Sequence, residues 1–90
     1  MNLDLLIEQA TNREIRGREE GEKLAVKMGY TWKEIIKCDK HKSVANARAI
    51  IQYYLYEDVG LSSSEIGILM KRDHSSVLNN IDKIKKKLNE

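Results

Sequence analysis

The chain has 90 residues, which is enough for one small domain with a limited hydrophobic core. It contains no proline and five glycines, and 16 basic residues stand against 14 acidic ones, for a net charge of +2. This composition favours helices over loop-rich folds, and the small charge excess means that a case for nucleic-acid binding depends on how the basic residues cluster.

Apolar spacing and capping residues predict the first helices. Helical intervals separate Leu3, Leu6, Ile7 and Ala10, which predicts one or two amphipathic turns. Residues 11–14 (Thr-Asn-Arg-Glu) have the form of a capping box, so we expect a second helix to start there and to end at Gly29. Gly17 and Gly21 lie inside it and each costs about 1 kcal/mol relative to alanine, which weakens its first half.

Two further helices are predicted before residue 60. Residues 31–34 (Thr-Trp-Lys-Glu) form a second capping box and start a short helix that buries Trp32, Ile35 and Ile36. Residues 38–42 are polar and aperiodic, so we expect a loop. A long helix then runs from Ser43 to Gly60, and its apolar stripe consists of Val44, Ala47, Ile51, Tyr54, Leu55 and Val59.

The chain ends in two helices joined by a short turn. Residues 62–65 (Ser-Ser-Ser-Glu) form a third capping box, followed by Ile66, Leu69 and Met70. Asp73 is expected to cap a last helix that reaches Leu88, with an apolar stripe made of Val77, Leu78, Ile81, Ile84 and Leu88. Because no segment alternates with period two, we predict an all-α domain of five or six helices with a C-terminal helix-turn-helix.

Cysteine content and hydropathy argue against several classes of protein. The single cysteine, Cys38, cannot form an intramolecular disulfide, which indicates a reducing cytoplasm. Cys38 and His41 have a spacing typical of metal ligands, but His74 is the only other histidine, so we expect no metal and no cofactor. No apolar run is long enough to cross a membrane, and the first residues lack the basic start of a signal peptide.

Polar residues gather at the start of the last helix, where residues 72–76 read Arg-Asp-His-Ser-Ser. A helix with hydrogen-bonding groups at its N-terminus and an apolar stripe beyond them is typical of a recognition helix in the DNA major groove. A guanidinium can bond guanine O6 and N7 together, and a carboxylate can accept a hydrogen bond from cytosine N4.

Three segments of the sequence match the motifs of a known family of DNA-binding domains. Residues 62–67 read Ser-Ser-Ser-Glu-Ile-Gly, residues 72–79 read Arg-Asp-His-Ser-Ser-Val-Leu-Asn, and residues 40–48 form a basic stretch that leads into a helix. Together they resemble the C-terminal DNA-binding domain of the chromosomal replication initiator DnaA family, whose motif runs Ser-Leu-Pro-Glu-Ile-Gly and then Arg-Asp-His-Thr-Thr-Val-Leu-His. We therefore assign residues 23–90 to such a domain and residues 1–22 to an N-terminal helical extension. Lys71 alone stands where the family has Gly-Gly.

The resemblance implies roles for individual residues. It places Arg72, Asp73, His74 and Ser75 on base edges in the major groove. It places Ser76 and Arg48 on backbone phosphates, to which we add Lys71. The basic loop, through Lys40 and Lys42, would enter or flank the minor groove.

The sequence thus predicts sequence-specific binding to double-stranded DNA, in replication initiation or its regulation or in transcription regulation, by a cytoplasmic, nucleoid-associated protein. We expect no enzyme, because no nucleophile or pair of carboxylates is arranged for chemistry. The chain lacks a Gly-x-x-x-x-Gly-Lys-Ser/Thr loop, so no nucleotide is expected. We expect a monomer, with a homodimer through residues 3–10 as the alternative. A protein-interaction module that keeps the fold without binding DNA is the second hypothesis.

Plainer interpretations stand beside these roles. Residues 72–75 can be an ordinary helix start that faces solvent, and residues 40–42 can be a solvated loop. Arg48 can pair with Glu57 or Asp58. The lysines of residues 83–87 are best explained by solubility and by the dipole of a helix C-terminus.

Overall fold

The computed structural model describes residues 3–37 and 42–89, and for residues 5–11 it describes the backbone alone. The described residues contain no strand, so the predicted all-α fold is confirmed. The elements are α1 (Leu3–Lys27), α2 (Trp32–Ile36), α3 (Lys42–Tyr54), the π-helix η1 (Leu55–Val59), α4 (Ser63–Met70) and α5 (His74–Leu88).

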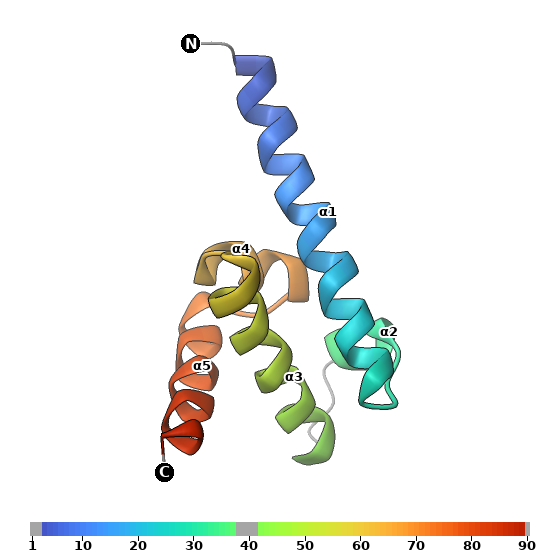
Figure 1. Cartoon of the computed structure of the whole chain (residues 1–90), viewed down its shortest axis with the longest axis vertical. Helices are drawn as coiled ribbons and strands as arrows, with labels where there is room; N and C mark the ends of the chain where they lie inside the picture. Colours follow the sequence, from blue (N-terminus) through green and yellow to red (C-terminus); the bar gives the residue numbers. More distant parts are fainter. Residues whose placement is uncertain (1–2, 38–41, 90) are drawn as a thin grey trace.

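Helix α1 is one continuous helix of 25 residues, and the predicted helix start at residues 11–14 is wrong. The N-cap residue of a capping box has an extended backbone, whereas Thr11 is helical, and the residues that precede it include no glycine or proline that would interrupt the helix. The first half of α1 extends away from the other helices (Figure 1). The predicted boundary between residues 22 and 23 lies inside this helix and stays a prediction.

The second half of α1 lies close to the rest of the domain because two of its residues have no side chain. A Cβ atom on Gly21 would lie 2.8 Å from Cζ3 of Trp32, and one on Gly17 would lie 2.5 Å from Cδ1 of Leu61. Both glycines are buried. They cost helix propensity, but they allow α1 to approach an aromatic ring and a leucine directly.

The caps of α2 and α4 confirm two of the predicted capping boxes. Thr31 Oγ1 accepts a hydrogen bond from Glu34 N at 3.2 Å, and Glu34 Oε1 accepts one from Thr31 N at 3.0 Å. Ser62 and Glu65 repeat this arrangement at 3.2 and 3.1 Å. Each pair provides hydrogen-bond acceptors for two backbone N–H groups that would otherwise bond to water at the helix start.

The long helix predicted from Ser43 to Gly60 begins one residue earlier, at Lys42, and its last turn is the π-helix η1. Gly60 ends it with φ of 88°, a left-handed conformation that glycine adopts without strain. The hydroxyl of Tyr54 donates to Glu20 Oε2 at 3.0 Å and ties α3 to α1. This bond to a carboxylate raises the pKa of the Tyr54 phenol.

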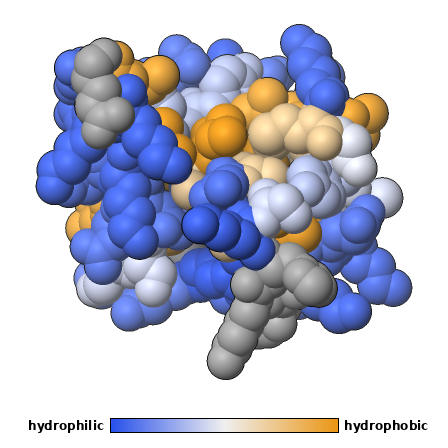
Figure 2. All heavy atoms as spheres, turned by 90° about the horizontal axis from the view of Figure 1, so that it is seen from below, coloured by the Kyte–Doolittle hydropathy of each residue, from blue (hydrophilic) through white to orange (hydrophobic). Residues whose placement is uncertain are grey.

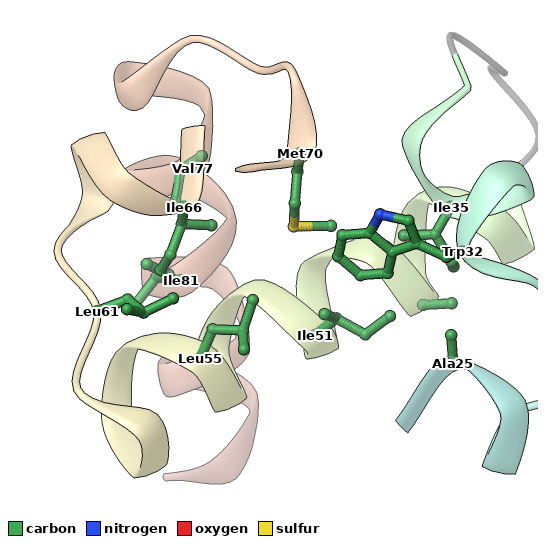
Figure 3. Packing of buried hydrophobic residues seen from close by; sticks show 11 residues of the cluster. Ala25, Trp32, Ile35, Ile51, Leu55, Leu61, Ile66, Met70, Val77 and Ile81 are labelled. Carbon is green, nitrogen blue, oxygen red and sulfur yellow. The ribbon is translucent and has the colours of Figure 1, made fainter. Parts of the chain in front are cut away.

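One hydrophobic core joins all the elements, and α3 crosses its centre (Figure 3). Its residues are Ala25, Trp32, Ile35, Ala47, Ile51, Leu55, Leu61, Ile66, Met70, Val77 and Ile81. Trp32 is therefore a core residue, as predicted. The α3–α5 pair forms the largest contact between elements. Leu78 and Leu88, which were placed on the apolar stripe of the last helix, are 44% and 64% exposed and lie outside this core. No described helix is both long and apolar enough to cross a membrane.

Replacing Gly21 by alanine should lower the free energy of unfolding by about 1–3 kcal/mol, because the new methyl group overpacks against the buried Trp32 ring. Urea unfolding followed by far-UV circular dichroism measures this change. Asn12→Ala is the matched control, since Asn12 is exposed on the same helix and alanine only improves helix propensity there. Equal stability of Gly21→Ala and wild type would show that α1 can move away from Trp32 at no cost.

Candidate nucleic-acid interface

The connection between α4 and α5 is a three-residue turn built around a left-handed lysine. Lys71 has φ of 56° and ψ of 47° and is the only non-glycine residue with positive φ among those described. Its N–H group points to the carbonyls of Gly67 and Ile68, which closes α4. A side chain in this conformation costs about 1–2 kcal/mol. The single Lys71, where the family has Gly-Gly, is therefore accommodated by backbone strain at this residue.

Gly67 allows this turn to fold back onto α4. The N–H of Arg72 donates to the carbonyl of Gly67 at 2.8 Å. A Cβ atom on Gly67 would lie 2.7 Å from the carbonyl oxygen of Arg72 and 3.5 Å from the amide nitrogen of His74. These neighbours are backbone atoms, so they cannot rotate away as a side chain can. The absence of a side chain at residue 67 thus places the start of α5.

The first turn of α5 has an inner and an outer face. Val77 and Ile81 are 0% and 5% exposed and hold the helix on the core. Asp73, His74, Ser75 and Ser76 are all exposed. The structure therefore brings together at one surface three of the four residues that were predicted to read bases, and one that was predicted to hold a phosphate.

Asp73 occupies the N-cap position of α5, but the predicted side-chain cap is wrong, because its carboxylate makes no capping hydrogen bond. Oδ1 instead lies 3.4 Å from Nδ1 of His74. The two side chains are 69% and 60% exposed, so neither is held in the core. The carboxylate and the imidazole thus form an exposed acceptor and donor pair beside the first amides of the helix.

Arg72 is half-buried, and its guanidinium reaches across to the end of α2. Nη2 donates to the carbonyl of Lys37 at 2.8 Å, and Nη1 donates to the carbonyl of Lys71 at 3.2 Å. The contact of Arg72 with a base stays a prediction. To make it, the guanidinium has to exchange its bond to the Lys37 carbonyl for a bond to a base.

Arg48 is 7% exposed and its guanidinium bonds to backbone carbonyls. Nε donates to Ile35 at 2.8 Å and Nη2 to Lys37 at 2.9 Å. The predicted phosphate contact stays a prediction, and it would be made by a guanidinium that already holds two carbonyls.

Of the three lysines predicted to contact DNA, the structure describes two. Lys42 is the exposed first residue of α3, and Lys71 is exposed in the turn. Lys40, together with Cys38 and His41, lies outside the described residues. The described residues contain no cluster of three or more histidine, cysteine, aspartate or glutamate side chains that could hold a metal.

The C-terminal lysines pair with acidic neighbours. Lys86 Nζ lies 3.1 Å from Asp82, and Lys85 Nζ lies 3.8 Å from Glu57. Figure 2 shows that hydrophilic residues cover most of the face it views, around a smaller hydrophobic area. The position of these lysines in the last turn of α5 is consistent with the predicted complementarity to the helix dipole, and their role stays a prediction.

Two contacts that support the interface were not foreseen from the sequence. Arg13 Nη2 donates to Glu65 Oε1 at 3.0 Å and to the carbonyl of Gly60 at 2.9 Å, which ties α1 to the start of α4. Asn80 Nδ2 donates to Gln52 Oε1 at 2.8 Å, which ties α5 to α3. A glutamine four residues after Arg48, beside an apolar stripe, was the one signal in the sequence for the second contact.

Comparison with known proteins identifies the family of the chain. The family described as bacterial dnaA protein helix-turn-helix matches residues 22–84. Two proteins named chromosomal replication initiator protein DnaA, from Thermosipho melanesiensis and Thermosipho africanus, are each 32% identical to the chain over 57 residues. The match covers 63% of this chain and 13% of each relative, so the chain spans a small part of their length. No solved structure matches the chain significantly.

Replacing Gly67 by alanine should lower the free energy of unfolding by about 1–3 kcal/mol, because the methyl group meets the backbone of the turn. Thermal and urea unfolding measure the loss. Ile68→Ala is the matched control on the same helix, since Ile68 is 75% exposed and its truncation removes little buried area. A Gly67→Ala variant as stable as Ile68→Ala would contradict the close approach of α4 and the turn.

Proposed function

The chain belongs to the family of bacterial dnaA helix-turn-helix domains, and we propose that it binds double-stranded DNA sequence-specifically, with α5 as its recognition helix. The observation that carries this proposal is the first turn of α5. Its polar residues are exposed together, while Val77 and Ile81 anchor the opposite face in the core. A helix held in this way can enter the major groove with its N-terminal turn without leaving the domain.

In this proposal, Arg72, Asp73, His74 and Ser75 contact base edges. Asp73 accepts from an exocyclic amine such as cytosine N4, and His74 and Ser75 bond to the neighbouring bases. The 3.4 Å pair of Asp73 and His74 supports these roles, because both side chains are exposed and already lie side by side. Arg72 bonds guanine from its position at the end of the turn.

Backbone contacts set the register of the helix on the duplex. We assign Ser76 and Lys71 to phosphates next to the first amides of α5, where a helix N-terminus favours an anion. Lys40 and Lys42 approach the minor groove from the connection between α2 and α3. Arg48 supports that connection through the carbonyls of Ile35 and Lys37, and any phosphate contact of its own would add to this support.

The biological role we propose is replication initiation or its regulation. The relatives are named chromosomal replication initiators, and this chain matches 13% of their length. A protein of this kind that recognises the DNA boxes of the initiator competes with the initiator for them or binds them alongside it. The competing function is a protein-interaction module that keeps this fold, and it predicts binding that does not depend on residues 72–75.

Arg72→Ala should weaken binding to a duplex that carries an initiator-type box by about 1–3 kcal/mol and relax specificity at one base pair. His74→Ala should reduce the same preference while leaving the fold intact, because His74 is exposed. Fluorescence anisotropy with a box duplex and a scrambled duplex measures both affinities.

Lys86→Ala is the control for these variants, since Lys86 is exposed, pairs with Asp82 and lies three turns along α5. If wild type binds both duplexes equally, the box is not the site, and selection from a random duplex pool must identify it. If no duplex is bound at low salt, the interaction module replaces DNA binding as the leading function.

Lys40→Ala should weaken binding to all duplexes about equally and reduce the slope of log affinity against log salt by about 1, because a phosphate contact is lost without a base contact. Salt titrations of wild type and variant measure the slope. A change confined to the preferred sequence, at an unchanged slope, would assign Lys40 to base reading instead.

A further inference from the structure

A partly buried amide pair joins the proposed recognition helix to the centre of the domain. Asn80 of α5 donates from Nδ2 to Oε1 of Gln52 in α3, at 2.8 Å. Gln52 is 0% exposed, whereas Asn80 is half-buried. Within the described part of the chain, Nε2 of Gln52 has no hydrogen-bond partner.

This pair contributes little to stability. A neutral hydrogen bond replaces bonds to water, so its net gain on folding is small. An unpaired amide group in the core loses its hydration without compensation, which outweighs that gain. Exchanging the Oε1 and Nε2 atoms of Gln52 would place two amide donors opposite each other unless the amide of Asn80 were exchanged as well. An apolar side chain of similar shape would fill the same space without this cost.

The hydrogen bond of the pair also bears on the geometry of α5. Asn80 lies three residues after Val77 and one before Ile81, so it belongs to the face that packs on α3. The apolar contacts on this face are non-directional and permit small rotations of the helix. A hydrogen bond has a preferred distance and angle, so the amide pair selects one rotation.

A small rotation of α5 matters at its first turn. Side-chain atoms lie about 6 Å from a helix axis, so a rotation of about 20° moves them by about 2 Å. This exceeds the distance range of a hydrogen bond to a base edge. Contacts to phosphates tolerate such a movement better, because long lysine and arginine side chains adjust to it.

We propose that Gln52 and Asn80 are positioning residues for base reading: their hydrogen bond fixes the rotation of α5 on α3 at the expense of stability. This inference rests on the proposed function, since it assumes that α5 reads DNA. It places a determinant of specificity in the core, away from the surface that touches DNA.

Gln52→Met is the decisive variant, because methionine has a similar length and shape and carries no amide. We expect its melting temperature to equal or exceed that of wild type, while the ratio of the affinities for the preferred and scrambled duplexes falls about tenfold. Affinity for the scrambled duplex should remain unchanged. A purely structural role would lower the stability and leave this ratio intact.

The reciprocal exchange Gln52→Asn with Asn80→Gln is the matched control. It keeps two amides and the same summed side-chain length, so it should recover most of the lost discrimination. Asn12→Ala, an exposed change on α1, is the control for non-specific effects of a substitution.

A measurement without DNA separates this inference from the proposed function. Residual dipolar couplings give the orientation of α5 relative to α3 in free wild type and in Gln52→Met, and we expect them to differ. Identical couplings, or a Gln52→Met protein that discriminates duplexes as wild type does, would overturn the inference. If wild type prefers no duplex even after selection from a random pool, the proposed function fails, and the couplings still decide whether the amide pair orients α5.

Discussion

Burial of Val77 and Ile81 is the interaction on which the rest of the interface depends. Both side chains are almost fully buried, and burial of a large aliphatic side chain contributes about 1.5–3 kcal/mol. Exposed polar contacts at the helix start contribute less, so they cannot decide how α5 lies. Since the two apolar residues face α3 and α4, the residues just before them have to face outward. The exposure of Asp73, His74 and Ser75 follows from this packing.

The turn before α5 must bring the chain from buried Met70 to buried Val77 in very few residues. This requires a sharp reversal, which Lys71 provides with its left-handed backbone. It also requires the turn to touch α4, which Gly67 permits. The strain at Lys71 is local, and burial of Met70 and Val77 on either side offsets it. A lysine that adopts this conformation also presents a positive charge beside the helix start.

Local patterns in the sequence predicted the local parts of this structure. The capping boxes at Thr31 and Ser62 formed because both partners lie within four residues of each other. The same pattern at Thr11 did not form a helix start, because the residues before it continue the helix. The π-helix at residues 55–59 and the bond of Asn80 to Gln52 were missed. The bond of Asn80 to Gln52 joins residues that are 28 positions apart in the chain, which periodicity and capping do not reveal.

The carbonyl of Lys37 links the two parts of the molecule that are proposed to contact DNA. It ends α2, just before the basic loop, and it accepts hydrogen bonds from Arg48 of α3 and from Arg72 of the turn. Arg48 is buried, so removing its partners would leave a charge in the core, and this bond is therefore a permanent part of the fold. Arg72 is half-buried, so water or a base can replace the Lys37 carbonyl as the partner of its guanidinium at lower cost. The carbonyl oxygen of Lys37 thus joins the start of the loop to the start of the recognition helix. Its bond to Arg48 is a fixed part of the fold, and its bond to Arg72 is exchangeable.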